Sequence, residues 1–584
     1  MSRRIPPRLR RPWLIAPLAV VTAAAALSMA RVYTATSTVT SAAATSSTPV
    51  VDPGGSTLSH RKAGVTGALG VTFGFEDRTI AGGPYDNQGN QIYNYPLYEA
   101  STGSAAAFWD NYVEELVSAG VDFVAVDTRG YIPGSAVPNE GGDPRELSQL
   151  VDAINRAGDA DKLKIAALDD TPASMTDKKN QIVHHTGGYS PPFDMGDTTG
   201  AREGGYQYLW DNDLKAFFQA VPDNLLYKVD GQPLVYLWSD NSFAFTNQGS
   251  GNSARLLQYV RSQAQSTFGE NPYFVVDQSW LQNDPSTASV ANGEDDWFGV
   301  PGPTYTNQTF NGSSYGVTVP SFHVVTAAAN MVIDPNHGQT LVNDLEATVG
   351  AGDKLTLVEG FTDWPEGAAL WRTQDAPYST TQRDYPNQDL QILRRYSRTP
   401  FPADMTVQAE SADAVSGTLG NPWNLYRGDG LGVQTTTDIG GGWNVGDIAA
   451  GESEQWDEVP MQGTEDLQVR VATPNAGGAL RFVIDGVAGP VVNVPNTGGW
   501  QTWQTVDAGT FIFNPGTYHT VRIQYLTGAM NINWWKAVSV KTPVISLRAH
   551  ANGMIVTAEN AGARPLIANR TAIGSWEEFD LIRD

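Results

Sequence analysis

The most constraining feature of the sequence is an alternation, between Gly64 and Pro400, of short apolar runs with amphipathic helical segments. The runs are rich in Val, Ile and aromatic residues, and Phe108, Trp109 and Tyr112 recur at helical spacing before the second run. Strands that alternate with helices imply parallel βα units, so we expect a (β/α)8 barrel of the TIM type over residues 64–400, with a doubly wound sheet as the alternative. The expected strands are 71–75, 121–126, 163–168, 233–238, 273–277, 322–325 and 355–359.

Carboxylates recur where these apolar runs end. The C-terminal ends of barrel strands converge on one rim, which is where active sites are built. For any single Asp, capping of the next helix is the alternative. Aromatic rings stack on sugar faces and acids bond hydroxyls, so the combination favours a carbohydrate substrate. The expected substrate contacts at the strand ends are Asp127, Asp170, Asp240, Asp277, Glu359 and Trp238.

The densest group of acids follows the last of these runs. Glu359, Asp363 and Glu366 lie within eight residues, interleaved with Phe361 and Trp364. In a confined pocket they cannot all stay ionised, so one is expected to hold a raised pKa as general acid while another stays anionic. Glycoside cleavage needs such a pair, whereas a solvated acidic loop or a cation site would be the alternatives.

Residues 361–367, Phe-Thr-Asp-Trp-Pro-Glu-Gly, resemble the loop of the family 99 glycoside hydrolases, whose two catalytic carboxylates lie three residues apart. The resemblance implies that Glu366 is the acid/base, that Asp363 is its partner and that Trp364 contacts substrate. The segments 120–127 and 230–238 are similar to strands of that family's barrel. The whole domain resembles an uncharacterised family of secreted hydrolase-like barrels related to families 99 and 71.

Two departures from the family 99 loop bear on the mechanism. Asp363 stands where that family has Glu, and Pro365 replaces a polar residue. The shorter side chain withdraws the carboxylate, so Asp127, Asp170, Asp240 and Asp277 stay open as alternative partners of Glu366.

The first 30 residues carry five Arg and then an apolar run that ends in Ser28-Met29-Ala30. This pattern predicts a secretory signal peptide over 1–30, with an uncleaved anchor as the alternative. Residues 31–63, rich in Ser, Thr and Ala, predict a flexible linker. The protein is therefore expected to be secreted or held at the cell surface.

Net charge and cysteine content exclude several functions. A net charge of −25 disfavours binding to nucleic acid, and the absence of cysteine excludes disulfides, thiol nucleophiles and Cys-ligated metals. The seven His show no zinc-binding spacing, and His184 and His185 are at most substrate contacts in a loop. We expect a monomer with no catalytic cofactor and no stable membrane partner.

After Pro400 the helical periodicity stops, and short alternating runs separated by Gly, Asn and Pro predict a β-sandwich (jelly roll) over 401–541. Segments such as 407–410, 440–446, 494–503 and 530–534 resemble family 6 carbohydrate-binding modules in family order.

That resemblance implies specific roles for four residues. Trp500 would stack on the ligand and Asn531 would bond it, while Glu410 and Asn533 would hold a structural calcium ion. The family's second ring position is Asp447, so Trp443 or Tyr426 would have to supply the opposite face.

Residues 542–584 resemble one lobe of a fascin-like β-trefoil, a fold that needs three lobes to bury its core. Taken together, the sequence predicts a secreted glycoside hydrolase that acts on an α-mannan- or α-glucan-like polysaccharide or glycan. A catalytically silent carbohydrate-binding or adhesion protein is the alternative, and a lyase is disfavoured because the first domain has few Lys or Arg to hold uronates.

Overall fold

The computed structural model describes residues 62, 64–73, 93–96, 105–128, 144–170, 193–198, 207, 209–240, 245–325, 330–375, 383, 387–399, 404–412, 414–417, 420, 422, 430–438, 443–540, 544–560, 562–574 and 576–580. Apart from Lys62, the predicted signal peptide and linker lie outside these residues, as do His184, His185 and Tyr426. In the described part of the chain, no helix combines the length and the apolar character needed to cross a membrane.

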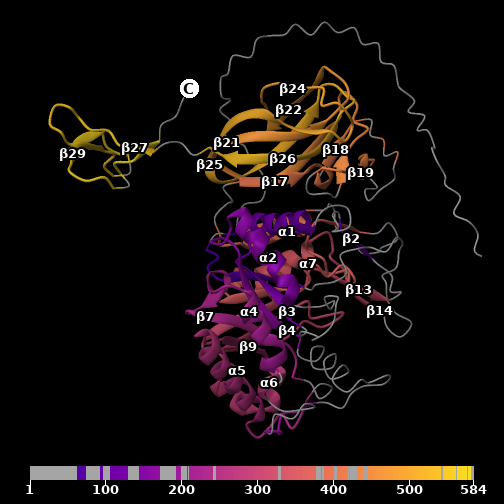
Figure 1. The fold of residues 1–584 in the computed structure, drawn as a ribbon, viewed down its shortest axis with the longest axis vertical. Helices are drawn as coiled ribbons and strands as arrows, with labels where there is room; N and C mark the ends of the chain where they lie inside the picture. The colour runs from indigo at the N-terminus through magenta and orange to yellow at the C-terminus, as the bar shows by residue number, and fades with distance from the viewer. Residues whose placement is uncertain are drawn as a thin grey trace, which may run out of the picture. The chain divides into compact units, whose positions relative to one another are not determined.

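A ten-stranded sheet forms the centre of the first domain. Eight of its strands run parallel and neighbour one another in chain order, with β15 returning to β1. Figure 1 labels several of them. They are β1 (Ala68–Phe73), β3 (Phe123–Thr128), β4 (Lys164–Asp169), β7 (Gln232–Leu237), β9 (Tyr273–Asp277), β10 (Gly293–Asp295), β12 (Ser313–Thr318) and β15 (Leu355–Val358).

Side chains connect the two ends of this parallel set. The Tyr315 hydroxyl on β12 donates to the Asn292 carbonyl, just before β10, at 3.0 Å. Gly293 allows this approach, because a Cβ there would lie 2.6 Å from the Tyr315 ring. No ladder joins β10 to β12 among the described strands. The sheet is therefore barrel-like, and side-chain contacts connect the β10 end of the parallel set with β12.

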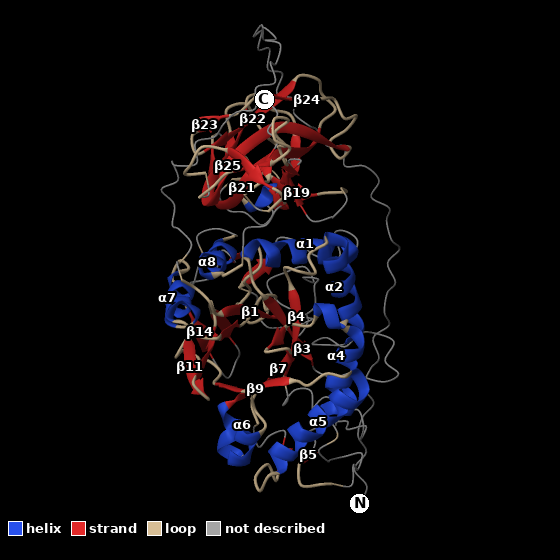
Figure 2. Ribbon diagram, turned by 90° about the vertical axis from the view of Figure 1, so that its left-hand side faces the viewer, coloured by secondary structure: helices blue, strands red, loops and turns tan. Residues whose placement is uncertain are grey.

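The helices surround the parallel strands, as Figure 2 shows. Helix α1 illustrates why they pack there: Trp109, Tyr112 and Leu116 are fully buried, and the rings of Trp109 and Tyr112 lie 5.5 and 4.8 Å from that of Phe73 on β1. Each such side chain contributes about 1.5–3 kcal/mol by burial. The helices are α1 (Ala105–Ala119), α2 (Pro144–Ala157), α4 (Lys215–Ala220), α5 (Asn252–Phe268), α6 (Gln278–Asn283), α7 (Gln339–Ala347) and α8 (Gln388–Tyr396).

The expected strand at 322–325 is not part of this sheet. It is β13 (Phe322–Val325), which pairs only with β14 (Asn330–Ile333) among the described strands. The parallel strands β10 and β12 were not expected, because Gly-Glu-Asp and Ser-Ser-Tyr-Gly-Val-Thr lack a continuous apolar run. Further short pairings join β11 (Tyr305–Phe310) to β12, β2 (Asn94–Pro96) to β16 (Thr373–Asp375), β5 (Phe193–Asp194) to β8 (Phe245–Thr246), and β6 (Lys228–Val229) to β7.

Residues 404–540 form a second β-rich unit, as expected, coloured orange to yellow in Figure 1. Its two longest strands, β21 and β25, pair along most of their length with three register shifts, and such irregularities bend the strands. Its strands are β17 (Asp404–Gln408), β18 (Ala414–Ser416), β19 (Val433–Thr435), β20 (Trp443–Val445), β21 (Ser453–Ala472), β22 (Gly478–Ile484), β23 (Val487–Ala488), β24 (Val492–Val494), β25 (Trp503–Tyr525) and β26 (Asn531–Ser539).

The C-terminal segment contains two short antiparallel pairs, β27 (Val544–Ile545) with β30 (Phe579–Asp580), and β28 (Ile555–Thr557) with β29 (Ile567–Arg570). Ile555 is buried, whereas Leu566, Ile573 and Trp576 are about half exposed. The trefoil assignment of this segment stays a prediction.

Candidate functional site

The packing of α1 identifies the inner face of the parallel strands. Phe73 of β1 contacts Trp109 and Tyr112 of α1 and therefore faces the helices, so Gly70, three residues earlier, faces the interior, as does its ladder partner Phe123. Side chains alternate along a strand. Asp127, four residues beyond Phe123, therefore faces the interior at the C-terminal end of β3, where it is 7% exposed. Its ladder partner Leu168 places Asp170, two residues further on, on the same face.

Glu359 reaches this interior from the end of β15. Thr72, which faces the same side as Gly70, donates from its hydroxyl to Glu359 Oε2 at 2.9 Å. The same hydroxyl accepts from the Gly360 amide at 2.7 Å. The carboxylate is therefore fixed at the rim of the barrel-like sheet, as expected from its position after a strand.

Asp277 is the last residue of β9, which four strands separate from β15 in the sheet order, and it is 6% exposed. Its Oδ1 accepts from the amide of Ser279 at 2.9 Å and from the hydroxyl of the same residue, so it also caps α6. Its Oδ2 faces the amide of Trp297 at 3.4 Å. Burial raises the pKa of Asp277, and these hydrogen bonds partly offset the effect.

Two tryptophans flank Asp277. The rings of Trp238, after β7, and Trp297, after β10, are half-buried and meet edge to face with centroids 5.9 Å apart. The Trp238 carbonyl accepts from the indole of Trp280 at 2.8 Å, which fixes that segment. Carboxylates beside part-exposed indoles suit the hydroxyls and apolar faces of a sugar.

Asp240 is not brought to the rim. It is fully buried, and its Oδ2 accepts from the Ser253 hydroxyl of α5 at 3.2 Å, while its carbonyl accepts from the Asn283 side chain at 2.5 Å. Burial raises its pKa to about 7. These contacts give Asp240 a structural role that its position in the sequence does not distinguish from substrate binding.

The predicted catalytic pair forms a tight turn. Asp363 is half-buried, and its Oδ1 accepts from the Glu366 amide at 3.0 Å, whereas the Glu366 side chain is exposed. The Glu366 carbonyl accepts from the amide of His323 at 2.7 Å. Trp364 is only 3% exposed and packs into the core. The turn brings Asp363 and Glu366 close together, and their catalytic role stays a prediction.

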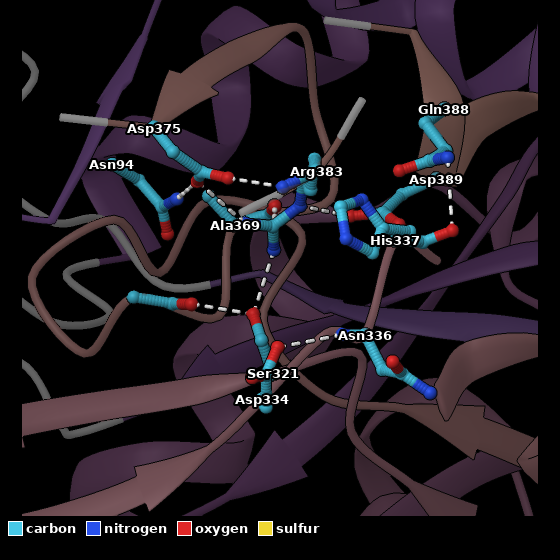
Figure 3. Close-up of polar contacts among 11 residues, drawn as sticks. Asn94, Ser321, Asp334, Asn336, His337, Ala369, Asp375, Arg383, Gln388 and Asp389 are labelled. Carbon is cyan, nitrogen blue, oxygen red and sulfur yellow. Dashed lines mark hydrogen bonds and ion pairs between the residues drawn. The ribbon is translucent and has the colours of Figure 1, made fainter. Parts of the chain in front are cut away.

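A buried arginine anchors the segment that follows this turn (Figure 3). Arg383 Nη2 donates to the Ala369 carbonyl at 3.1 Å and to the Ser321 hydroxyl at 2.7 Å. Ser321 in turn donates to the Gly367 carbonyl at 2.6 Å. The guanidinium also pairs with Asp375 at 2.9 Å and with Asp389 at 2.5 Å. No motif in the sequence indicates this arginine, because its partners lie between 6 and 62 residues away along the chain and meet only in the folded structure.

A further buried acid at the rim, Asp295, also escaped the sequence analysis. It ends β10, is 4% exposed, and is the ladder partner of Asp277. Burial raises its pKa well above the usual range, and the charge of Asp277 adds to the shift.

In the second unit, Trp500 is 46% exposed on the loop before β25. Asn531 is 2% exposed and donates from its side chain to the Trp500 carbonyl at 2.7 Å, so it holds this loop in place. Trp443 is 5% exposed in the core of the unit and Asp447 is exposed. Trp443 therefore does not supply an opposite ring for Trp500.

The side chains of Glu410 and Asn533 contact different residues. Glu410 Oε1 lies 3.3 Å from a guanidinium nitrogen of Arg372, while the Asn533 side chain donates to Asp438 at 2.9 Å. Across the described residues no group of three or more Asp, Glu or His forms a metal-binding cluster. An arginine supplies positive charge beside Glu410, whereas the side-chain oxygen of Asn533 is buried with no hydrogen-bond partner among the described residues, and the structural calcium ion stays a prediction.

Comparisons with known proteins match the two units separately. Residues 65–414 match the family model described as Domain of unknown function (DUF5010). Residues 427–537 match that of Carbohydrate binding module (family 35), whereas the sequence resemblance named family 6. The expected carbohydrate-binding module is confirmed.

Individual relatives match only parts of the chain. The clotting factor G alpha subunit of Tachypleus tridentatus is 32% identical over 134 residues, 22% of this chain and 19% of that protein. The arabinoxylan arabinofuranohydrolase of Paenibacillus polymyxa is 26% identical over 231 residues, 38% of this chain and 32% of that protein. The solved carbohydrate-binding module of Cellvibrio mixtus lichenase 5A, in complex with cellotriose, is 33% identical with a TM-score of 0.20, covering 23% of this chain and 96% of that one. The chain thus spans less than a third of either curated relative.

Proposed function

We propose that this chain, which belongs to the DUF5010 family, is a secreted glycoside hydrolase whose carbohydrate-binding module holds it on its polysaccharide. One observation carries the proposal: carboxylates from several strands, among them Asp127, Asp277 and Glu359, face the interior at the C-terminal edge of one parallel sheet. Trp238 and Trp297 lie beside them. Acids and indoles that converge in this way are what sugar binding and acid/base cleavage require.

The architecture we propose is a (β/α)8 barrel closed between β10 and β12. The strand order, the surrounding helices and the contact of Tyr315 with Asn292 support this closure. The relation to glycoside hydrolase families 99 and 71 is part of the same proposal and rests on the resemblance of residues 361–367. The substrate proposed from it is an α-mannan or α-glucan, and arabinoxylan joins the candidates through the name of the Paenibacillus relative.

Secretion or surface display and a monomeric state belong to this proposal as well. The Arg-rich apolar segment at residues 1–30 supports export.

A second candidate, a catalytically silent sugar-binding protein, is favoured by the turn at 363–366. There the Asp363 carboxylate bonds the Glu366 amide, and the Glu366 side chain is exposed rather than enclosed. A silent protein would bind the same polysaccharide without releasing reducing ends.

The test is a screen of the full chain on α-mannans, α-glucans and arabinoxylan, with reducing ends as the readout. If the loop pair supplies the acid and the base, Glu366→Gln and Asp363→Asn lower kcat on the active substrate by about 100-fold or more, because general acid/base groups contribute that much. Glu346→Gln is the matched control, since Glu346 is an exposed acid on α7. Full activity of both loop variants would remove Asp363 and Glu366 from the mechanism, and no cleavage by the unmodified chain would favour the silent protein.

A further inference from the structure

Asp277 and Asp295 form a carboxyl pair that the ladder register brings together. They are direct partners on the parallel strands β9 and β10, and partners in a ladder point to the same face. Neighbouring strands lie about 4.8 Å apart, so the two side chains leave their strands at about that spacing. Retaining glycosidases keep their two carboxyl groups about 5 Å apart.

The surroundings of the two acids differ. Asp277 accepts from the amide and hydroxyl of Ser279 and faces the Trp297 amide, and these donors stabilise a negative charge. Asp295 is more deeply enclosed, and the charged groups acting on it are all acids, namely Asp277, Asp296 and Glu294. Two neighbouring carboxyl groups with such different environments divide into one that keeps its proton and one that stays anionic.

A tyrosine hydroxyl adds an independent observation. Tyr236 on β7 is 2% exposed, and within the described residues its hydroxyl has no hydrogen-bond partner. Its ring stacks near that of Phe123, which faces the interior. Burial makes the largest contribution to the raised pKa of this hydroxyl, and the charge of Asp295 makes the next largest. A buried hydroxyl without a partner costs about 1–3 kcal/mol, which points to a water molecule or a ligand hydroxyl bound beside Asp295.

We propose that Asp295 is the general acid of the barrel-like domain, and that it protonates the glycosidic oxygen of a polysaccharide while Asp277 remains anionic beside it. This inference rests on the proposed hydrolase function and assigns the proton donor to Asp295 instead of Glu366. Tyr236 would hold a sugar hydroxyl or the water molecule beside Asp295.

The reaction balances with water as the only further reactant. As the bond between the anomeric carbon and the glycosidic oxygen breaks, that oxygen takes the proton of Asp295 and leaves as a hydroxyl group. The Asp277 carboxylate bonds to the anomeric carbon. Water then displaces Asp277, giving its hydroxyl to the anomeric carbon and its proton back to Asp295.

Infrared spectroscopy of the full chain at neutral pH tests directly whether Asp295 is protonated. A protonated carboxyl group has a C=O stretching band that a carboxylate lacks. The difference spectrum between the unmodified chain and Asp295→Asn is expected to contain this band. In Asp277→Asn the band should disappear at a lower pH than in the unmodified chain, because the variant lacks the neighbouring negative charge. Glu294→Gln, on the same strand but facing the other side, should leave the band present at neutral pH. Absence of the band from the Asp295→Asn difference spectrum would overturn the proposal.

Measurements of activity distinguish failure of this inference from failure of the proposed function. On the polysaccharide that the chain cleaves, Asp295→Asn is expected to lower kcat by about 100- to 1,000-fold. An aryl glycoside of the same sugar, whose leaving group needs no proton, should be cleaved with a much smaller loss, which a merely structural residue would not produce. Full activity of Asp295→Asn on the polysaccharide would overturn the inference and leave the hydrolase function standing. No cleavage of any glycan by the unmodified chain would overturn both the function and the general-acid role, even with the infrared band present.

Discussion

At the scale of single residues, burial decides the chemistry of the acids in this protein. Asp240, Asp277 and Asp295 all end or follow strands, yet their partners differ: Asp240 bonds Ser253 behind the rim, whereas Asp277 and Asp295 face the interior side by side. The position of an acid after a strand therefore does not distinguish substrate contact from a structural role.

Asp240 should make stability depend on pH. Its folded-state pKa of about 7 lies above the usual value of 3.8, so the folded chain binds more protons than the unfolded chain between about pH 4 and pH 7. Its contribution to the unfolding free energy is therefore fully present at low pH and is lost as the pH rises through about 7, by up to about 4 kcal/mol at about 1.4 kcal/mol per pKa unit.

Urea unfolding of the unmodified chain and of Asp240→Asn at pH 5 and pH 8 measures this difference. The unfolding free energy of the unmodified chain should fall relative to the variant at pH 8. Asp161→Asn, at an exposed site, is the control. Equal pH dependence of the Asp240 variant and the unmodified chain would contradict the assignment.

Trp500 should contribute to binding and little to folding. Because its ring is 46% exposed, Trp500→Ala is expected to leave the melting temperature unchanged and to weaken polysaccharide binding about tenfold, equivalent to about 1.4 kcal/mol. Affinity electrophoresis in gels that contain α-mannan, α-glucan or arabinoxylan measures the effect. Leu526→Ala, at a 38% exposed position of the same module, should not alter mobility. Unchanged retention of the Trp500 variant would exclude this loop from ligand binding.

At the scale of elements, the helices and strands with a strong apolar pattern could be predicted from the sequence. The spacing of Phe108, Trp109 and Tyr112 indicated α1, and the runs at β4, β7 and β9 indicated strands to within a residue or two. The sequence did not reveal β10 and β12, because two of the three residues of β10 are acids and β12 alternates Tyr and Val with Ser, Gly and Thr, so neither strand has a continuous apolar run.

The residues of the candidate site could be predicted only where they follow such a strand. Asp127, Asp277 and Glu359 follow recognisable strands, whereas Asp295 ends a strand that no pattern revealed. Arg383 could not have been predicted, since Ser321, Asp375 and Asp389 approach it only in the folded chain.

Arg383 should determine the stability of the segment after the 363–366 turn. Arg383→Met leaves the carboxylates of Asp375 and Asp389 enclosed without their cation, so the unfolding free energy is expected to fall by about 3–5 kcal/mol. Arg156→Met, which breaks an exposed ion pair with Asp110, should cost at most about 1 kcal/mol. Denaturant unfolding of both variants makes the comparison, and equal small losses would show that the buried pairs contribute no more than an exposed one.

At the scale of the whole molecule, the two units divide the proposed work. In the proposed hydrolase, the acids and indoles at the edge of the DUF5010 region would protonate and stabilise a sugar, and the module that matches family 35 would hold the polysaccharide. Some of the many acidic and aromatic residues of this cysteine-free chain therefore lie at two candidate binding places, the rim of the parallel sheet and the Trp500 loop.

The most direct test of this account follows product anomers by NMR while the full chain acts on the polysaccharide from which it releases reducing ends. The spacing of about 5 Å proposed for Asp277 and Asp295 predicts cleavage in which the first-formed product keeps the anomeric configuration of the substrate. An inverted first product would contradict this carboxyl pair. No reducing ends from any α-mannan, α-glucan or arabinoxylan, by a chain that still binds one of them, would contradict the hydrolase itself.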